Sequence, residues 1–148
     1  MAEKLGPLTG VRAITCSTAQ AGTVPYMMMA DLGAEVIKVE VPGVGDGSRT
    51  AGELRGAISS FFETNNRGVK SITLNLKSEE GREILHRLIE TADIFGQNFR
   101  PGAAEKNGFG YEELKKINPS LVYVSVSGYG QRGPHSDLPG TDAVGQAL

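Results

Sequence analysis

The sequence has a single cysteine and almost no excess of charge, and both absences narrow what the protein can be. Cys16 lies in an apolar run, and one cysteine in 148 residues excludes a disulfide framework and a cysteine-based zinc site. Lysine and arginine number 15 against 17 acidic residues, giving a formal net charge of −2. This balance provides no broad basic surface for nucleic acid or for anionic membranes. A chain without disulfides fits a reducing compartment, and we expect a cytoplasmic protein.

Long apolar runs and paired metal ligands are also missing. No window approaches the roughly 18 apolar residues that a membrane-spanning helix needs, and residues 1–10 contain no long apolar stretch. The two histidines, His86 and His135, are too far apart in sequence to indicate a metal pair. We therefore expect neither a membrane segment nor a bound metal.

What the sequence does contain is a regular alternation of strand and helix patterns. Short runs rich in β-branched residues predict strands at 11–16, 35–40, 70–76, 93–97 and 121–126. Helical patterns between them predict a buried helix with Pro25 in its first turn and Gly33 at its end, a helix capped by Ser78, and a short helix at 111–117. This order is typical of right-handed parallel units. We predict an α/β, doubly wound, mostly parallel Rossmann-like sheet in one domain, residues 1–148.

Two segments do not follow the alternation. The glycine-rich stretch at 42–56 predicts a loop, and the residues from Asp142 to Leu148 predict the opening turns of an apolar helix. A domain that ends inside such a helix is expected to be truncated at its C-terminus. We therefore expect an incomplete part of a larger fold.

A nicotinamide cofactor is one alternative for a sheet of this kind. Glu40 ends the second strand, where an acid would bind the ribose hydroxyls. The first turn, at 20–25, has one glycine where the dinucleotide fingerprint uses three to admit the pyrophosphate. We therefore expect no NAD, and we expect Glu40 to be a solvated residue at a strand end.

Four pairs of segments carry a resemblance to a known family. They are 20–22 with 30–40, 45–49 with 66–77, 98–102 with 118–119, and 127–131 and 133–134 with 139–142 and 146–147. The last pair includes the Pro139-Gly140-Thr141-Asp142 motif. In order and spacing the set resembles the class III CoA-transferases, the family that includes formyl-CoA and carnitine CoA-transferases.

The resemblance implies an activity, a ligand and an assembly. In that family the N-terminal Rossmann-like domain binds the nucleotide end of coenzyme A, the substrates are an acyl-CoA and a carboxylic acid, and two protomers interlock, so we expect a homodimer. Lys77 and Arg100 are the best phosphate candidates, because cations form strong charge-assisted bonds to phosphate. By position, the resemblance places CoA contacts at Gln20, Ala21, Leu74, Asn75, Leu76, Lys77, Asn98, Phe99, Arg100 and Lys106.

The resemblance also bears on catalysis. Family transferases use an aspartate that attacks the thioester and forms a covalent intermediate, and this nucleophile lies in a Gly-Asp segment beyond the Pro-Gly-x-Asp motif. Asp142 matches a supporting acidic position of the active site. Residues 1–148 alone are accordingly expected not to transfer CoA.

Two other functions stay open. The α-methylacyl-CoA racemases share the fold and place a catalytic histidine where this sequence has Thr141, so a proton transfer would lack its base. A non-catalytic chain that binds CoA or a partner is the second alternative. The sequence also departs from the family at Val69, usually basic, and at Asn75, usually aspartate, which predicts a less polar CoA cleft.

Overall fold

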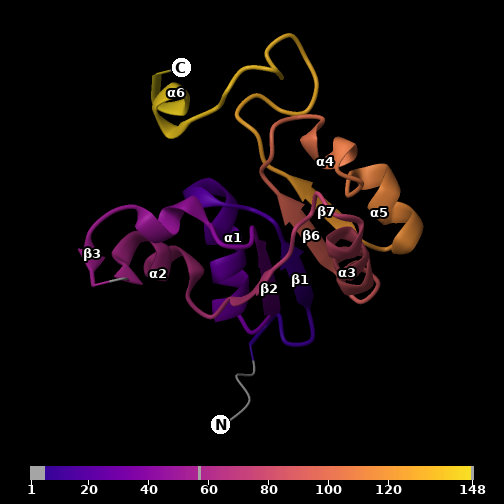
Figure 1. The fold of residues 1–148 in the computed structure, drawn as a ribbon, viewed down its shortest axis with the longest axis horizontal. Coiled ribbons are helices and arrows are strands. Elements are labelled where there is room, and N and C mark those ends of the chain that lie inside the picture. The colour runs from indigo at the N-terminus through magenta and orange to yellow at the C-terminus, as the bar shows by residue number, and fades with distance from the viewer. Residues whose placement is uncertain (1–5, 57, 148) are drawn as a thin grey trace.

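The protein is built around one parallel sheet. A computed structural model describes residues 6–56 and 58–147 (Figure 1). Its five-stranded sheet has the order β5-β2-β1-β6-β7, and every pairing is parallel. The strands are β1 (Arg12–Thr15), β2 (Glu35–Glu40), β5 (Lys70–Thr73), β6 (Ile94–Gln97) and β7 (Val122–Ser125). The predicted α/β class with a mostly parallel sheet is confirmed.

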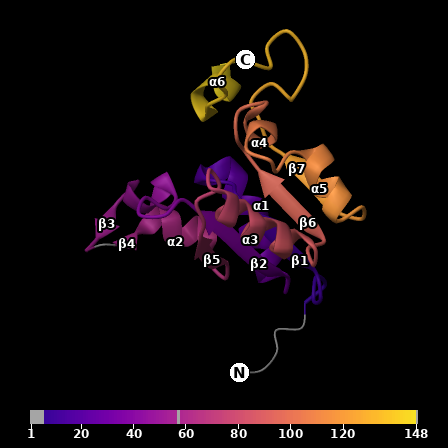
Figure 2. The ribbon, with the colours of Figure 1, turned by 45° about the vertical axis from the view of Figure 1, so that its right-hand side comes forward.

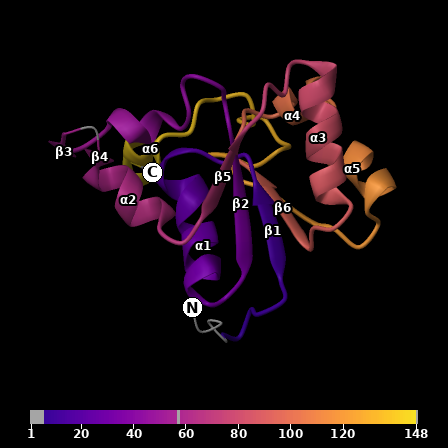
Figure 3. The same ribbon diagram turned by 60° about the horizontal axis from the view of Figure 1, so that its bottom comes forward.

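Helices cover both faces of this sheet. The helices α1 (Ala19–Asp31) and α2 (Ser60–Asn66) lie on one side, and α3 (Glu79–Ile89) and α5 (Tyr111–Ile117) on the other (Figure 3). The chain moves outward from β1 to β5 and then returns to add β6 on the other side of β1. Because crossovers between parallel strands are almost always right-handed, such a reversal places helices on both faces. The sheet is therefore doubly wound, with its switch point between β1 and β6.

The core is divided by the sheet into two clusters. Neighbouring residues of β1 point to opposite faces, so Ile14 packs with Leu85, Phe95 and Leu114 while Ala13 packs with Tyr26. The cluster under α3 and α5 is the larger of the two. It extends to the carboxyl ends of the strands, where its aromatic residues form the floor of the site described below.

The predicted elements lie where the sequence placed them, with local differences at the ends. β2 and α5 have the predicted bounds, and the other strands are shorter by one to three residues. Ser78 caps α3, since its hydroxyl accepts a hydrogen bond of 3.1 Å from the amide of Gly81. Gly33 follows α1 at a φ of 99°, the left-handed conformation that glycine adopts without strain.

The expected start of α1 is wrong. The helix begins at Ala19, so Pro25 lies inside it rather than in its first turn. Proline has no amide hydrogen and leaves the carbonyl of Ala21 without its helical donor. The helix continues through this position because its inward face, with Tyr26 and Met27, is buried against the sheet.

The stretch predicted as a loop at 42–56 contains regular structure. A 3₁₀ helix, η1 (Gly47–Thr50), is followed by a hairpin of β3 (Leu54–Arg55) and β4 (Ile58–Ser59), which projects away from the sheet (Figure 2). Two-residue strands are too short to show an alternating pattern. The helix α2 that follows was also not predicted, because it is short and mostly polar and depends on its cap, where Ser59 accepts from the amide of Phe62 at 3.1 Å.

Two short helices complete the chain. α4 (Ala103–Lys106) follows β6, and α6 (Asp142–Ala147) begins where the sequence predicts a final helix. α6 lies beyond the carboxyl ends of the strands, apart from the sheet (Figures 1 and 2). Within the described residues, none of the helices has the length and apolar character needed to cross a membrane.

The packing of Gly81 generates the first prediction. A Cβ atom at this position would lie 2.1 Å from the carbonyl oxygen of Asn75. Although alanine favours a helix over glycine by about 1 kcal/mol, we expect Gly81→Ala to lower the free energy of unfolding by about 1–3 kcal/mol because backbone must move. Urea denaturation measures this change. Gly47→Ala, where a Cβ meets open space, is the matched control, and a Gly81→Ala chain as stable as the parent would contradict the packing.

Candidate functional site

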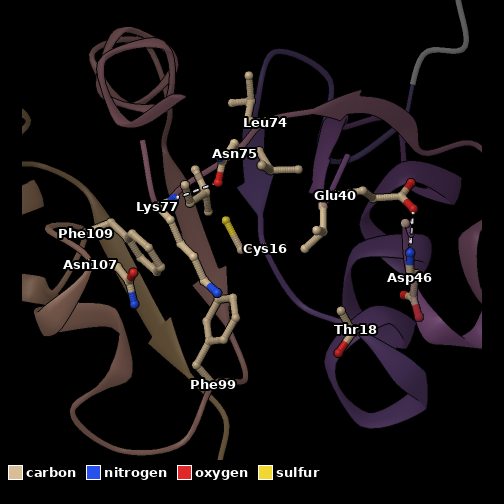
Figure 4. A pocket seen from close by; sticks show the side chains of 14 residues that line it. Cys16, Thr18, Glu40, Asp46, Leu74, Asn75, Lys77, Phe99, Asn107 and Phe109 are labelled. Carbon is tan, nitrogen blue, oxygen red and sulfur yellow. Dashed lines mark hydrogen bonds between the residues drawn. The ribbon is translucent and has the colours of Figure 1, made fainter. Parts of the chain in front are cut away.

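A pocket opens at the carboxyl ends of the strands, close to the switch point. Its volume is about 280 Å³, and ligands of open α/β sheets bind at this edge. Segments that follow β1, β2, β5 and β6 all contribute to it (Figure 4). Its lining is Cys16, Thr18, Val39, Glu40, Val41, Gly45, Asp46, Leu74, Asn75, Leu76, Lys77, Phe99, Asn107 and Phe109. We call this the larger pocket.

The floor of the larger pocket is apolar. Phe99 and Phe109 pack with ring centroids 5.6 Å apart, and Leu74 and Val39 continue the same surface. The sulfur of Cys16 points into this region (Figure 4). Burial raises the pKa of the Cys16 thiol to about 12, so it stays protonated and serves as a small apolar wall. Such a floor suits a flat ring.

Lys77 supplies the positive charge of the larger pocket. Among the described residues that line it, Lys77 is the one cation, and its ammonium has no hydrogen-bond or ion-pair partner in that part of the chain. Its side chain reaches toward the ring of Phe99 (Figure 4). Backbone hydrogen bonds hold the loop that carries Lys77. The amide of Leu74 donates to the backbone carbonyl of Glu40 at 3.0 Å, and the amide of Ser78 donates to the backbone carbonyl of Asn75 at 3.0 Å.

The two acids in the lining are already neutralised. Arg49 binds both carboxylate oxygens of Glu40, at 2.8 and 2.7 Å, and Ser71 and the amide of Asp46 bind the same group at 2.6 and 2.8 Å. Burial alone would raise the pKa of Glu40, but these hydrogen bonds outweigh it and lower the pKa to about 2. Glu40 is therefore ionised and fully engaged, and the expectation of a solvated side chain is wrong.

A buried lysine holds the second acid. Lys38 is 1% exposed, forms an ion pair with Asp46 and donates to Asn66 at 2.7 Å. Asp46 also accepts from the amide and hydroxyl of Ser48, at 2.8 and 2.7 Å. Burial opposes the charge on Asp46, yet the bonds from Lys38 and Ser48 lower its pKa below the ordinary value. We call Lys38, Glu40, Asp46 and Arg49 the β2 charge network.

A second pocket, of about 230 Å³, lies next to the first. The two share Phe99, and the second also contains Asn98, Arg100 and Thr141. Ser127 lines it as well, with a hydroxyl that is buried and has no hydrogen-bond partner in the described chain. A ligand long enough to pass Phe99 would contact both pockets.

The structure distributes the sequence-predicted site residues over these two pockets. Leu74, Asn75, Leu76 and Lys77 line the larger pocket, Asn98 and Arg100 line the second, and Phe99 lines both. Lys77 and Arg100 therefore line different pockets, which share Phe99.

The remaining predicted residues lie beside the pockets rather than in their lining. Gln20 and Ala21 are exposed in the first turn of α1, next to Thr18. Lys106 is exposed at the end of α4, beside the pocket residue Asn107. Asp142 begins α6, and its side chain lies outside the described part of the structure.

Sequence reasoning missed the β2 charge network. The signal was present, because a strand with Lys38 and Glu40 on one face precedes a loop with Asp46 and Arg49, two pairs of opposite charge. The departure at Val69 does not reach the larger pocket, since this side chain packs in the cluster under α1. Asn75 does line the pocket.

Comparison with known proteins now defines the class. Residues 8–148 match the sequence model of CoA-transferase family III, and the chain belongs to this family. An acetyl-CoA:oxalate CoA-transferase of Acetobacter aceti is 44% identical over 147 residues, which is 99% of this chain and 38% of that protein. A human succinyl-CoA:glutarate CoA-transferase is 43% identical over 143 residues, 96% of this chain and 33% of that protein.

Solved structures agree with the fold. The crystal structure of Rv3272 from Mycobacterium tuberculosis superposes with a TM-score of 0.89 at 40% identity, covering 95% of this chain and 39% of that one. A CAIB/BAIF family protein from Brucella suis gives a TM-score of 0.89 at 39% identity, with 95% and 38% covered. The chain thus spans less than two fifths of the length of these relatives.

The β2 charge network generates a pH prediction. The folded-state pKa of Glu40, about 2, lies below its ordinary value of 4.5, so its contribution to stability is present above pH 4.5 and is lost as the pH falls toward 2. We expect the free energy of unfolding to decline across this window, and to decline less steeply in Glu40→Gln, which is also less stable at neutral pH. Urea denaturation at a series of pH values measures both.

Glu53→Gln, in an exposed segment, is the control and should keep the slope of the parent. A Glu40→Gln chain with the same slope as the parent would show that Glu40 does not carry the acid sensitivity.

Proposed function

We propose that this chain forms the CoA-binding part of an enzyme that transfers coenzyme A between an acyl-CoA and a carboxylic acid. The observation that carries the proposal is the larger pocket, with its apolar floor and one unpaired cation at the carboxyl ends of the strands. CoA combines a flat adenine ring with several phosphates. Phe99 and Phe109 offer a surface for the ring, and Lys77 offers a charge for a phosphate.

The shape of CoA also fits the second pocket. CoA carries a pyrophosphate and a separate 3′-phosphate on its ribose, so one cation in each of two adjoining pockets suits CoA better than it suits one compact anion. Lys77 serves the larger pocket and Arg100 the second. The first turn of α1, with the exposed residues Gln20 and Ala21, follows Thr18 of the larger pocket. Backbone amides in the first turn of a helix have no acceptor within the helix and can bind an anion.

The transfer reaction is proposed for the whole protein, as a homodimer. An aspartate nucleophile attacks the thioester carbonyl and forms an acyl anhydride with release of the CoA thiolate. The thiolate then attacks the aspartyl carbonyl, which releases the donor acid and leaves an enzyme–CoA thioester. The acceptor carboxylate attacks this thioester, and the thiolate that is released attacks the acceptor's carbonyl in the new anhydride, which gives the product acyl-CoA and frees the aspartate. Asp142 is assigned a supporting role at this centre. The relatives named for oxalate and glutarate make dicarboxylates the first acceptors to test.

A racemase reaction is not favoured by this site. Thr141 lines the second pocket, where proton abstraction beside the thioester would require a base. A hydroxyl with an ordinary environment is a poor base near neutral pH. CoA transfer therefore remains the function that the residues support best.

The role of Lys77 is tested by calorimetric titration of the chain with CoA. We expect Lys77→Ala to weaken CoA binding by about tenfold or more, since one charge-assisted bond to phosphate contributes about 1.5–3 kcal/mol. Lys70→Ala is the matched control, because this lysine pairs with Glu35 at the amino end of β5 and lies outside both pockets. Equal affinities for the two variants would contradict a phosphate contact at Lys77.

A further inference from the structure

The turn between β1 and α1 is held by side chains from two distant loops. Asn98, which follows β6, accepts from the amide of Thr18 at 3.0 Å and donates to the carbonyl of Thr18 at 2.8 Å. Both ends of its amide are thus bound to a single residue of the backbone. From the other side, a carboxylate oxygen of Asp46 lies 3.4 Å from the amide nitrogen of Ala19.

The residue between these two contacts has an unusual conformation. Ala19 has a φ of 57°, and among the described residues it is the one non-glycine residue with a positive φ. Side chains with a Cβ rarely adopt this left-handed conformation, which persists where the surroundings impose it. Thr18 lines the larger pocket and Asn98 the second, so the strained turn lies between the two.

The turn is also closely packed from below. A Cβ at Gly22 would lie 2.6 Å from the side-chain nitrogen of Asn98 and 2.8 Å from the Cβ of Ser17. Asn98 therefore has little freedom to change rotamer or to turn toward a ligand. Both polar atoms of the Asn98 side chain are hydrogen-bonded to Thr18. In this respect Asn98 differs from Lys77 and Arg100, whose charges are unpaired within the described residues.

We propose that Asn98 is a positioning residue, which holds Ala19 in its left-handed conformation and thereby aims the first turn of α1 at the ligand. This inference deepens the proposed CoA site and rests on it for the ligand. Asp46 supports the same turn from the β2 charge network. The left-handed residue sets the direction in which the chain enters α1, and so determines where Gln20, Ala21 and their amides point.

The test is a double-mutant cycle between Asn98 and Ala19. Glycine adopts a positive φ without penalty, so Ala19→Gly removes the need for a clamp. We expect Asn98→Ala to weaken CoA binding by about tenfold, the scale of one strained residue. Adding Ala19→Gly to Asn98→Ala should restore most of that affinity, whereas Ala19→Gly alone should change it less than about threefold.

The same cycle measured by urea denaturation does not depend on CoA. We expect the two substitutions to be coupled, with Asn98→Ala lowering the denaturation midpoint and the added Ala19→Gly recovering part of the loss. Additive effects on stability would overturn the clamp. Coupled stability with no CoA binding by the parent chain would instead overturn the proposed function and leave the clamp standing.

Asn118→Ala is the matched control. Its side chain likewise binds distant backbone, donating to the carbonyls of Ile89 and Ala92 at 3.1 and 2.7 Å, but it follows α5 and lines neither pocket. It should lower stability without coupling to Ala19 and without changing CoA affinity. Additive losses of affinity for Asn98→Ala and Ala19→Gly would show that Asn98 binds the ligand directly. If Asn98→Ala does not fold, slow hydrogen exchange of the Thr18 amide in the parent chain supports the clamp, and fast exchange contradicts it.

Discussion

The buried ion pair between Lys38 and Asp46 is the interaction on which the site depends. Lys38 lies in the middle of β2, and its partner lies in the loop that follows, so the pair folds that loop back onto the sheet. Two residues further along β2, Glu40 forms a second ion pair with the same loop, through Arg49. Loss of one partner from a buried pair typically costs about 3–5 kcal/mol, because the other charge is left unpaired. These two ion pairs therefore tie the segment 41–50 to β2.

The segment 41–50 shapes the proposed CoA site. It provides one wall of the larger pocket, brings the Asp46 carboxylate to the start of α1, and uses both acids of the lining in internal contacts. The positive charge of Lys77 is then not cancelled within the pocket. The larger pocket thus has a wall whose acids are paired and, among its described lining residues, one cation without a partner, an arrangement that favours an anionic ligand.

Local patterns predicted the strands and helices, and contacts between distant segments account for what they did not predict. Polar and apolar residues alternate along 70–76, which contains β5, and Ser78 is a typical helix cap. The length of α1 depends on packing against the sheet, which no local pattern shows, and α2 is a short, mostly polar helix that depends on its Ser59 cap. The same limit applies to the site, because Lys77 and Arg100 look equivalent in the sequence and only the position of Phe99 separates their pockets.

Titration of the ¹⁵N-labelled chain with CoA, followed by amide chemical shifts, tests the location of the site most directly. CoA bound in the larger pocket should shift the amides of residues 74–77, Phe99 and Phe109, and leave the β3–β4 hairpin unchanged. No shifts at millimolar CoA, or shifts confined to residues outside both pockets, would contradict CoA binding at the carboxyl ends of this sheet.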